Sequence, residues 1–291
     1  MLKLQTPVTC EPSKVTISYE DRILVLGSCF AENIGTKMLN AGFDACVNPF
    51  GVLYNPISVC NSFQRMKFGV PFTERDCVEM GAGAGLICSF SHHTSFADPT
   101  PEGFLAKSNK ALEESKTFME GCNKVIITLG TAWCYRHEAT GETVSNCLKR
   151  PAAEFTRYRL TVDSTVAALS GMIKRNPDKQ FIFTVSPVRH LKDGAHGNMI
   201  SKSTLILAVE ELCRLYPDQV GYFPSFEIVT DELRDYRFYA EDMVHPSETA
   251  VNYIWERFVD FAVPQSEHSR LAENERAWRA SQHRPIHKIN Y

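Results

Sequence analysis

Short runs of apolar residues recur along the chain, and stretches of helical period lie between them. The apolar runs occupy residues 23–27, 85–90, 124–130, 181–186 and 220–223. Strands that are apolar along nearly their whole length are typical of a parallel sheet buried on both faces. Apolar residues at helical spacing occur within residues 30–41 and 201–215. This alternation predicts a doubly wound, three-layer α/β/α fold around a central, mainly parallel sheet.

The strand and helix pattern extends over residues 1–263, which we expect to form a single α/β domain. Within it, residues 67–105 are less regular and rich in glycine, serine, threonine and histidine. We expect this segment to be an excursion from the sheet, where α/β enzymes often build substrate contacts. Residues 264–291 are charged and have few apolar anchors, so we expect a peripheral helix at 273–281 followed by an extended tail.

Composition and charge exclude several classes of function. The chain has 291 residues, with 31 basic and 34 acidic side chains and a formal net charge of -3. This balance provides no positive field for a nucleic-acid partner. The longest apolar runs are far shorter than the ~20 residues of a membrane-spanning helix, and the N-terminal residues contain no apolar stretch of signal-peptide length. We therefore expect a cytoplasmic protein that binds neither nucleic acid nor membranes.

Ten cysteines are scattered along the chain without a Cys-x-x-Cys pair. This spacing argues against a structural zinc site and a thioredoxin-like motif. Scattered thiols in an intracellular-type chain are most often small buried side chains, so we expect no disulfide bonds, no metal and no other cofactor. The glycine motifs that bind nucleotide phosphates are also absent, which disfavours a phosphate-binding α/β protein.

The segment most informative about chemistry is residues 24–32, where an apolar strand pattern ends at Gly27 and a helical pattern begins after Ser28. Ser28 is therefore expected at the carboxyl edge of the sheet, where open α/β folds bind ligands. The first N–H groups of the following helix point to the same place and form a ready oxyanion site. Serine is also a favoured helix N-cap, so this segment alone does not distinguish a nucleophile from a cap.

A second set of chemically active residues, Asp242 and His245, precedes the helical pattern of residues 251–259. Three residues apart on a short loop, the carboxylate can hydrogen-bond the imidazole, fix its tautomer and leave the other nitrogen free for a nucleophile. Pro246 stiffens the chain directly afterwards. The same spacing also occurs by chance, in which case the histidine is an incidental residue of a surface loop and Ser247 caps the helix.

Together, Gly-Ser after the first strand and Asp-x-x-His-Pro near the end of the domain resemble the SGNH (GDSL-type) hydrolases. The string Gly27-Ser28-Cys29-Phe30-Ala31 narrows the resemblance to the GSCFA family, a bacterial branch of SGNH-like proteins with a flavodoxin-like fold. Further segments similar to the family occur at 48–56, 128–132, 186–190, 198–202 and 231–239. The resemblance covers roughly residues 20–260.

By this resemblance, Ser28 is the nucleophile, His245 the general base and Asp242 the carboxylate that orients the histidine. The backbone N–H groups of Ser28 and Gly51 are the expected oxyanion donors. The resemblance implies an ester hydrolase or O-acyl (O-acetyl) transferase that acts on a small ester or an acylated carbohydrate through an acyl-serine intermediate, without a cofactor. The alternative is a catalytically weak or inactive domain that binds a carbohydrate or an anionic metabolite in the same crevice.

The sequence departs from the SGNH pattern at a third oxyanion donor. Where those enzymes have an asparagine two residues after a glycine, this chain has Ala132, which has no side-chain donor. Loss of one such donor typically costs about 10²–10³ in turnover. The candidate replacements are the side chains of Thr131, Asn55, Asn146, His92 and His93. Each also has a local alternative, such as a turn, a helix cap or a partly exposed pair.

Arg189 and His190 follow the apolar run 181–186, so they too are expected at the carboxyl edge. The Arg189 guanidinium could bind a carboxylate, phosphate or sugar hydroxyl of the substrate, or it could pair with an acid of residues 231–235. Cys29 adjoins the candidate nucleophile, but successive residues point in different directions. We therefore expect Cys29 to pack at the start of its helix while Ser28 faces the catalytic histidine.

Overall fold

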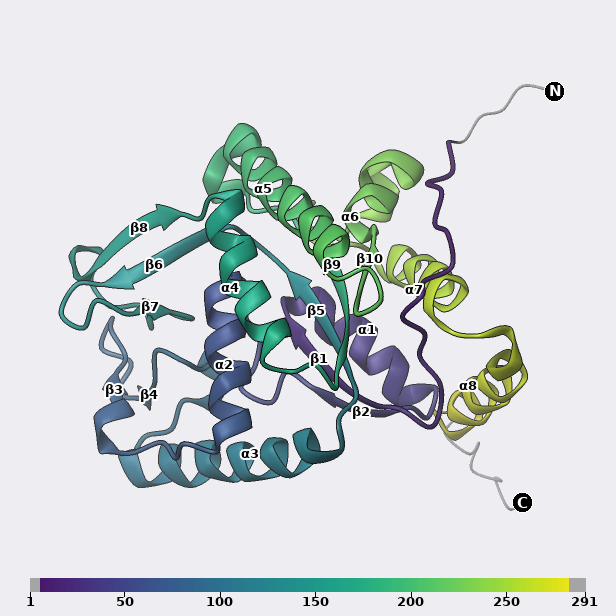
Figure 1. Cartoon of the computed structure of the whole chain (residues 1–291). Helices are drawn as coiled ribbons and strands as arrows, with labels where there is room; N and C mark the ends of the chain where they lie inside the picture. The colour runs from purple at the N-terminus through teal and green to yellow at the C-terminus, as the bar shows by residue number, and fades with distance from the viewer. Residues whose placement is uncertain (1–5, 283–291) are drawn as a thin grey trace, which may run out of the picture.

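The structure is a computed structural model that describes residues 6–282. A parallel sheet of five strands lies at its centre, in the order β10-β9-β5-β1-β2 (Figure 1). These strands are β1 (Arg22–Gly27), β2 (Asp44–Val47), β5 (Lys124–Leu129), β9 (Gln180–Val185) and β10 (Val220–Phe223). Four of the five predicted apolar runs form strands of this sheet, and the predicted α/β fold class is confirmed.

The direction of the winding reverses between β1 and β5. The chain first moves outward from β1 to β2 and then returns past β1 to β5, β9 and β10. At the junction, Gly27 on β1 pairs with Thr128 on β5. Open α/β sheets bind ligands in the crevice outside the carboxyl ends of the strands at such a switch point. The topology therefore marks the edge beyond Gly27 as the place for a site.

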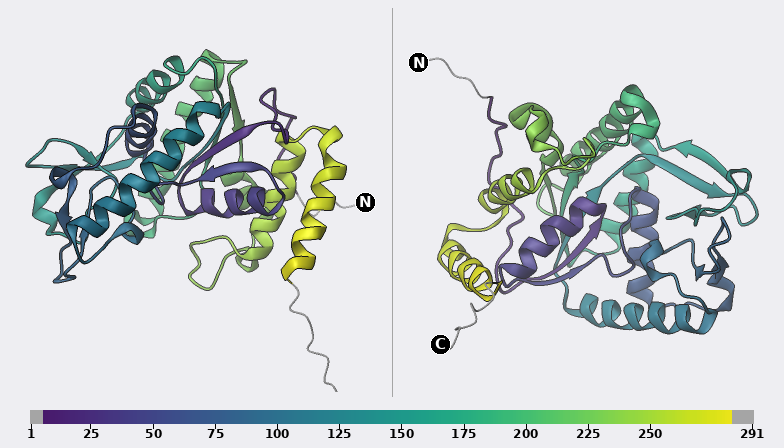
Figure 2. Two further views of the ribbon diagram at one scale, coloured as in Figure 1. Left: turned by 90° about the horizontal axis from the view of Figure 1, so that it is seen from below. Right: turned by 180° about the vertical axis from the view of Figure 1, so that it is seen from behind.

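Helices cover both faces of the sheet (Figures 1 and 2). One face carries α1 (Cys29–Asn40), α7 (Glu248–Ala262) and α8 (His268–Gln282), and the other carries α2 (Pro56–Phe68), α3 (Pro101–Gly121), α4 (Val162–Lys174) and α5 (Gly194–Leu215). Ile23 and Val25 pack toward the first group, and Leu24 and Leu26 toward the second. Successive side chains of a strand point to opposite faces, so both faces of β1 are buried.

Residues 85–90 do not join the central sheet, and the prediction of a sheet strand there is wrong. Their strand, β4 (Ile87–Cys88), pairs with β3 (Val78–Glu79) in a small antiparallel sheet. Only Cys88 of the two β4 residues is buried. A segment this short and this exposed cannot fill an interior position of a parallel sheet, which requires burial on both faces.

A second antiparallel sheet extends from the end of β5 to one side of the molecule (Figure 1). Its strands are β6 (Trp133–His137), β7 (Thr143–Val144) and β8 (Phe155–Arg159). Only Cys134 and Val144 of these strands are buried, and polar residues interrupt the apolar ones, so the apolar pattern did not predict them. The remaining elements are a short α6 (Ser225–Glu227), a π-helical turn at Ile228–Leu233, and 3₁₀ turns at Glu74–Asp76, Thr94–Phe96, Ala152–Glu154, Leu191–Asp193, Tyr236–Phe238 and Gln265–Glu267.

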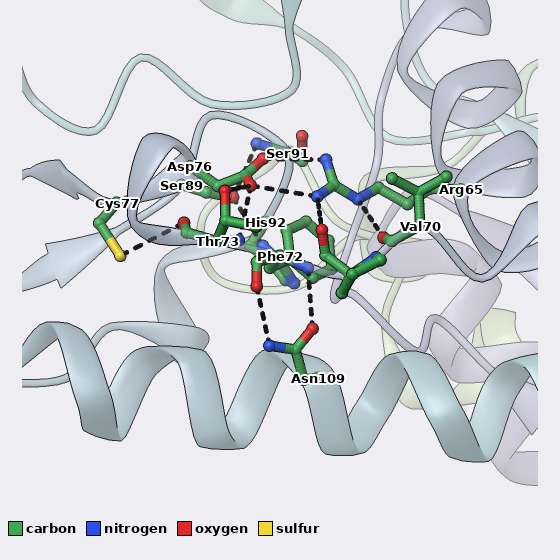
Figure 3. A network of polar contacts seen from close by, with 11 residues as sticks. Arg65, Val70, Phe72, Thr73, Asp76, Cys77, Ser89, Ser91, His92 and Asn109 are labelled. Atoms are coloured by element: carbon green, nitrogen blue, oxygen red, sulfur yellow. Dashed lines mark hydrogen bonds and ion pairs between the residues drawn. The ribbon is translucent and has the colours of Figure 1, made fainter.

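Polar contacts attach residues 72–76 to α2 and α3 (Figure 3). Arg65 on α2 donates from its two terminal nitrogens to the two carboxylate oxygens of Asp76, at 2.9 and 3.2 Å. Asn109 on α3 bonds both the N–H and the carbonyl of Phe72, at 2.8 and 2.9 Å. Bidentate pairs between arginine and a carboxylate combine strength with fixed geometry. This irregular stretch is therefore held in a defined conformation.

The chain as described ends in α8, which lies beside α1 and contains the helix expected at 273–281. Asn274 on α8 donates to the carbonyl of Ala41 at 2.8 Å, and Leu271 is buried. The rest of the expected tail, residues 283–291, lies outside the described residues. No helix within residues 6–282 has the length and apolar character needed to cross a membrane.

Candidate active site

The end of β1 requires a glycine. Gly27 has a φ of 134°, which L side chains rarely adopt, and a Cβ there would lie 2.1 Å from the carbonyl oxygen of Thr128. The N–H of Gly27 donates to Asn48 Oδ1 at 2.8 Å, and its carbonyl accepts the N–H of Leu53 at 2.8 Å. The turn from strand to helix is thus fixed on two sides, which places Ser28 at the switch point.

Ser28 occupies the N-cap position of α1, but its side chain does not cap the helix. The residue is 1% exposed, and its Oγ is buried without a hydrogen-bond partner among the described residues. A buried hydroxyl left unpaired is uncommon and costs about 1–3 kcal/mol. Capping therefore does not explain this side chain. The adjacent Cys29 is half-buried, and burial raises the pKa of its thiol, which disfavours a reactive thiolate.

Asp242 and His245 form a hydrogen-bonded pair on an exposed loop. Asp242 Oδ2 lies 2.6 Å from His245 Nδ1, and Oδ1 accepts the backbone N–H groups of His245 and Val244, both at 2.9 Å. These bonds, with that from the His245 backbone the largest, lower the pKa of Asp242 to about 2, so its carboxylate is charged at neutral pH. The His245 side chain is 46% exposed and that of Asp242 is 49% exposed. The contact expected from the sequence spacing is present.

The serine and the histidine are not hydrogen-bonded to each other. Ser28 Oγ contacts no donor or acceptor in the part of the chain that the structure describes, His245 included. The His245 loop nevertheless reaches the carboxyl edge, because the Val244 carbonyl accepts the N–H of Arg189, just beyond β9, at 3.3 Å. Asp242 and His245 are therefore hydrogen-bonded, whereas no hydrogen bond connects His245 to Ser28.

The two backbone groups expected as oxyanion donors are both engaged. The N–H of Ser28 donates to the carbonyl of Thr128 at 3.1 Å, and the N–H of Gly51 donates to the carbonyl of Asn48 at 2.7 Å. In this conformation neither amide is available to an oxyanion. Asn48, which the sequence analysis passed over, is buried beside Gly27 and has an unpartnered Nδ2. Asparagine tolerates the φ of 43° at this position, but the strand before it was not predicted, so no sequence pattern singled it out.

Three candidates for a replacement donor already have hydrogen-bond partners within the protein. Asn55 caps α2, because its side-chain oxygen accepts the N–H three residues later at 2.9 Å. Asn146 Oδ1 accepts the N–H two residues later at 2.8 Å. Thr131 Oγ1 shares a hydrogen bond with Ser201 Oγ at 3.0 Å. The contacts of Asn55 and Asn146 match the local alternatives considered for them, whereas the partner of Thr131 lies 70 residues away on α5.

His92 is a core residue. It is fully buried, and its Nδ1 bonds Ser89 Oγ at 2.7 Å (Figure 3). Its ring packs among the side chains of Phe50, Phe72, Phe96 and Phe104. Burial lowers the pKa of His92 to about 3, so the ring is neutral. His92 therefore connects residues 67–105 to the loop after β2 and is not accessible to a substrate. In the same region, His93 packs against Gly51.

Arg189 and His190 follow β9, as predicted. Arg189 Nε donates to Tyr239 Oη at 3.2 Å. Within the described residues, the acids at 231–235 pair with other cations and not with Arg189. Burial, reinforced by the charge of Lys202, lowers the pKa of His190 to about 4, so its ring is neutral and its Nε2 is buried without a partner.

One face of α5 holds the loops that follow β5 and β9. Asn198 Oδ1 accepts the N–H of His190 at 3.0 Å, and Ser201 Oγ accepts the N–H of Ala132 at 2.8 Å. Lys202, on the same face, donates to one carbonyl of each loop. All three side chains are buried. No role was predicted for them, although three polar residues at i, i+3 and i+4 before an apolar helix face were a usable signal.

A cavity of about 390 Å³ opens beside the loop of the Asp242–His245 pair. Its lining combines the guanidinium groups of Arg189 and Arg234 and the carboxylate of Asp235 with exposed apolar side chains, namely those of Leu191, Tyr236 and Met243. A larger cavity, of about 830 Å³, lies between α4 and α5 and contains none of the candidate residues. Over residues 6–282, no group of three or more His, Cys, Asp or Glu side chains is placed to hold a metal ion.

The fold and the site define an α/β protein with a serine at the end of the first strand and an Asp–His pair near the same edge. The GSCFA family model matches residues 22–258, and the chain belongs to this family. A solved structure from Streptococcus pneumonia, provisionally described as a platelet activating factor, is similar with a TM-score of 0.41 and 11% identity, over 82% of this chain and 84% of that chain. No curated protein sequence matches this chain significantly.

Proposed function

We propose that this chain is a serine-dependent ester hydrolase or acyltransferase of SGNH type, with Ser28 as nucleophile, His245 as general base and Asp242 as the orienting carboxylate. The observation that carries the proposal is the Ser28 hydroxyl, which is buried at the switch point and neither caps its helix nor bonds another group. Ser62, Ser108 and Ser170 also have unpartnered buried hydroxyls, but they lie within α2, α3 and α4, whereas Ser28 lies at the switch point. The hydrogen-bonded Asp–His pair supplies the base that a serine hydroxyl needs.

In the proposed reaction, Ser28 Oγ attacks the acyl carbon of an ester while His245 takes the hydroxyl proton. The bond between the acyl carbon and the alcohol oxygen then breaks, and His245 returns the proton to the leaving alkoxide. Water in a hydrolase, or a second alcohol in a transferase, next attacks the acyl-serine and gives its proton to His245, which passes it to Ser28. Asp242 stays ionised throughout and stabilises the imidazolium.

The proposal requires Ser28 Oγ and His245 Nε2 to meet during the reaction. His245 lies on an exposed loop that is joined to the end of β9 by one long hydrogen bond, from the N–H of Arg189 to the carbonyl of Val244 at 3.3 Å. A shift of this loop toward α1 closes the link, and catalytic hydrogen bonds often tighten only when substrate binds. The unpartnered Nδ2 of Asn48 supports a side-chain oxyanion donor in place of the one that Ala132 lacks.

The substrate class that we propose is a small ester or an acylated carbohydrate. The cavity beside the His245 loop supports this class, because its guanidinium groups suit a polar or anionic alcohol and its apolar walls suit an acyl chain. A second candidate function is a non-catalytic domain that binds a carbohydrate or an anionic metabolite in the same crevice. The engaged N–H groups of Ser28 and Gly51 favour that alternative.

A fluorophosphonate probe tests the two functions. We expect labelling at Ser28 in the wild type, none in Ser28→Ala and a large loss in His245→Ala. Ser247→Ala is the matched control, because Ser247 Oγ caps α7 by accepting a backbone N–H at 3.3 Å and should leave labelling unchanged. A well-folded wild type that is neither labelled nor active on a broad ester panel contradicts the enzymatic proposal. Unchanged ligand affinity in Ser28→Ala and His245→Ala would then support the binding domain.

A further inference from the structure

Lys202 is a buried lysine without a carboxylate partner among the described residues. The residue is 0% exposed, and its Nζ donates to the carbonyls of Gly130 and Ser186, both at 2.7 Å. An ammonium has three N–H donors, so these bonds leave one unused. Removing a charge from water without pairing it is costly. The two hydrogen bonds alone therefore do not explain why a lysine is buried at this position.

The ammonium lies at the carboxyl edge of the sheet, one strand from the switch point. Gly130 and Ser186 directly follow the adjacent strands β5 and β9, and the N–H of Ser186 donates to the carbonyl of Leu129 at 2.9 Å. On the other side of β5, the N–H of Ser28 donates to the carbonyl of Thr128 at 3.1 Å. Neighbouring strands are about 4.8 Å apart, and Gly130, whose carbonyl binds the ammonium, follows the strand next to the one that ends directly before Ser28.

No carboxylate of the described residues is free to neutralise the charge of the Lys202 ammonium. Burial lowers the pKa of Lys202 to about 7, opposed by Cys29 and Asp193. Burial keeps the Cys29 thiol protonated by raising its pKa, and Asp193 is already paired with Arg157. The ring of Phe226, 5.8 Å from Nζ, compensates only part of the charge. With a pKa of about 7, the amine is partly protonated at neutral pH, and no carboxylate of the described residues pairs with the protonated form.

We propose that Lys202 is a positioning residue of the Ser28 site. It holds the ends of β5 and β9 together and, in its protonated form, places a positive charge behind the point where the oxyanion of acyl transfer develops. This inference rests on the proposed function. A preorganised charge in a site without water stabilises a developing anion most effectively, because it needs no reorganisation when the reaction occurs.

A matched control lies at the opposite edge of the sheet. Lys179 is 5% exposed and, like Lys202, donates to two backbone carbonyls, those of Met119 and Cys122. It differs in having a carboxylate partner, because Asp178 lies 3.2 Å from its Nζ. Lys179 directly precedes β9, whereas the contacts of Lys202 directly follow β5 and β9. The two lysines therefore separate burial from proximity to the site.

The test measures the rate of fluorophosphonate labelling of Ser28 per folded molecule, together with kcat and KM for para-nitrophenyl acetate. We expect Lys202→Met to lower the labelling rate and kcat by about 10- to 100-fold, with KM changed by less than about twofold. Lys179→Met should lower the melting temperature and leave the labelling rate unchanged. Lys202→Arg keeps the charge and should retain more of the labelling rate than Lys202→Met.

Each outcome decides the proposal. A labelling rate of Lys202→Met within about twofold of the wild type overturns it. If Lys202→Met does not fold, Lys202→Gln and Lys202→Arg replace it, and equal labelling of these two variants overturns the role of the charge. A labelled wild type with an unaffected lysine variant rejects the role of Lys202 alone. A wild type that is not labelled rejects the proposed function, and this role with it.

Discussion

Polar groups are hydrogen-bonded at the amino edge of the central sheet, whereas some at the carboxyl edge are left without partners. At the amino edge, Asn123 donates to Asp21 at 2.6 Å and accepts a backbone N–H at 3.0 Å, and Lys179 has a carboxylate beside it. At the carboxyl edge, the Ser28 hydroxyl and His190 Nε2 are buried without partners. The polar groups of the amino edge thus stabilise the fold, whereas buried polar atoms at the carboxyl edge lack hydrogen-bond partners that a ligand would supply.

This difference indicates which edge of the sheet can bind a substrate. Polar atoms that are already paired cannot bind a substrate without first breaking a hydrogen bond. Unpaired buried atoms have a cost of about 1–3 kcal/mol each in the free protein, and they recover it when they bind. Substitutions that remove them are therefore expected to favour folding at the expense of function. The following predictions compare equivalent substitutions at the two edges or in similar turns.

Loss of the Asp242 charge should have the largest effect. Asp242→Asn removes the acceptor that fixes the His245 tautomer, so the rate of Ser28 labelling should fall by about 10³–10⁴. The side chain is 49% exposed, and the melting temperature should change little. Asp98→Asn is the control, because Asp98, like Asp242, accepts the backbone N–H two residues later but lies before α3 and outside the candidate site. A fall in the labelling rate of less than tenfold in Asp242→Asn would contradict the orienting role.

A methyl group at the end of β1 should have the next largest effect, on folding. Gly27→Ala should lower the free energy of unfolding by about 3–5 kcal/mol, because of its φ of 134° and the contact with the Thr128 carbonyl. Gly121→Ala at the amino edge should change it by less than about 1 kcal/mol, since its nearest contact is the flexible Arg22 side chain. Urea unfolding of both variants measures the difference, and similar values would disprove it.

Removal of one polar side chain from each edge should have effects of different sign. Ser28→Ala should leave the free energy of unfolding unchanged or raise it by up to about 1 kcal/mol, because the hydroxyl makes no hydrogen bond. Asn123→Ala should lower it by about 1–3 kcal/mol, because it leaves Asp21 and a backbone N–H without their partner. Thermal and urea unfolding provide the measurement. Clear destabilisation by Ser28→Ala would mean that the hydroxyl has a partner in solution.

Acid should have the smallest effect. The pKa of Asp242 is lowered from 3.8 to about 2, so the folded state holds its carboxylate charged where the unfolded state binds a proton. The resulting stability is present above about pH 4 and is lost as the pH falls through about 2. The difference in unfolding free energy between the wild type and Asp242→Asn should shrink over this interval. A difference that does not depend on pH would show that the hydrogen bond to His245 adds nothing in solution.

The sequence predicted those parts of the fold that are apolar on both faces. Residues 23–27 and 181–186 were recognised as strands because their runs are almost uninterrupted. The short β2 was missed because its four residues are only partly buried at the edge of the sheet. Residues 85–90 look like a strand, but nothing in their pattern reveals that β5 already occupies the place beside β1.

The candidate site could be predicted only where its residues are local in sequence. Ser28 follows from a strand end, and the Asp242–His245 contact follows from a three-residue spacing. The contacts of Lys202 could not be predicted, because Gly130 lies 72 residues away and offers a backbone carbonyl, which every residue has. The orientation of Ser28 Oγ and its separation from the histidine likewise depend on how α1 and the late loop pack.

The free cysteines have a practical consequence. Burial raises the pKa of all ten thiols, so few of them are thiolates near neutral pH. Maleimides react with the thiolate, and a cysteine introduced at Met243, which is 48% exposed, would be modified first. A single fluorophore attached there would follow the movement of the neighbouring imidazole in real time, with every native thiol left in place.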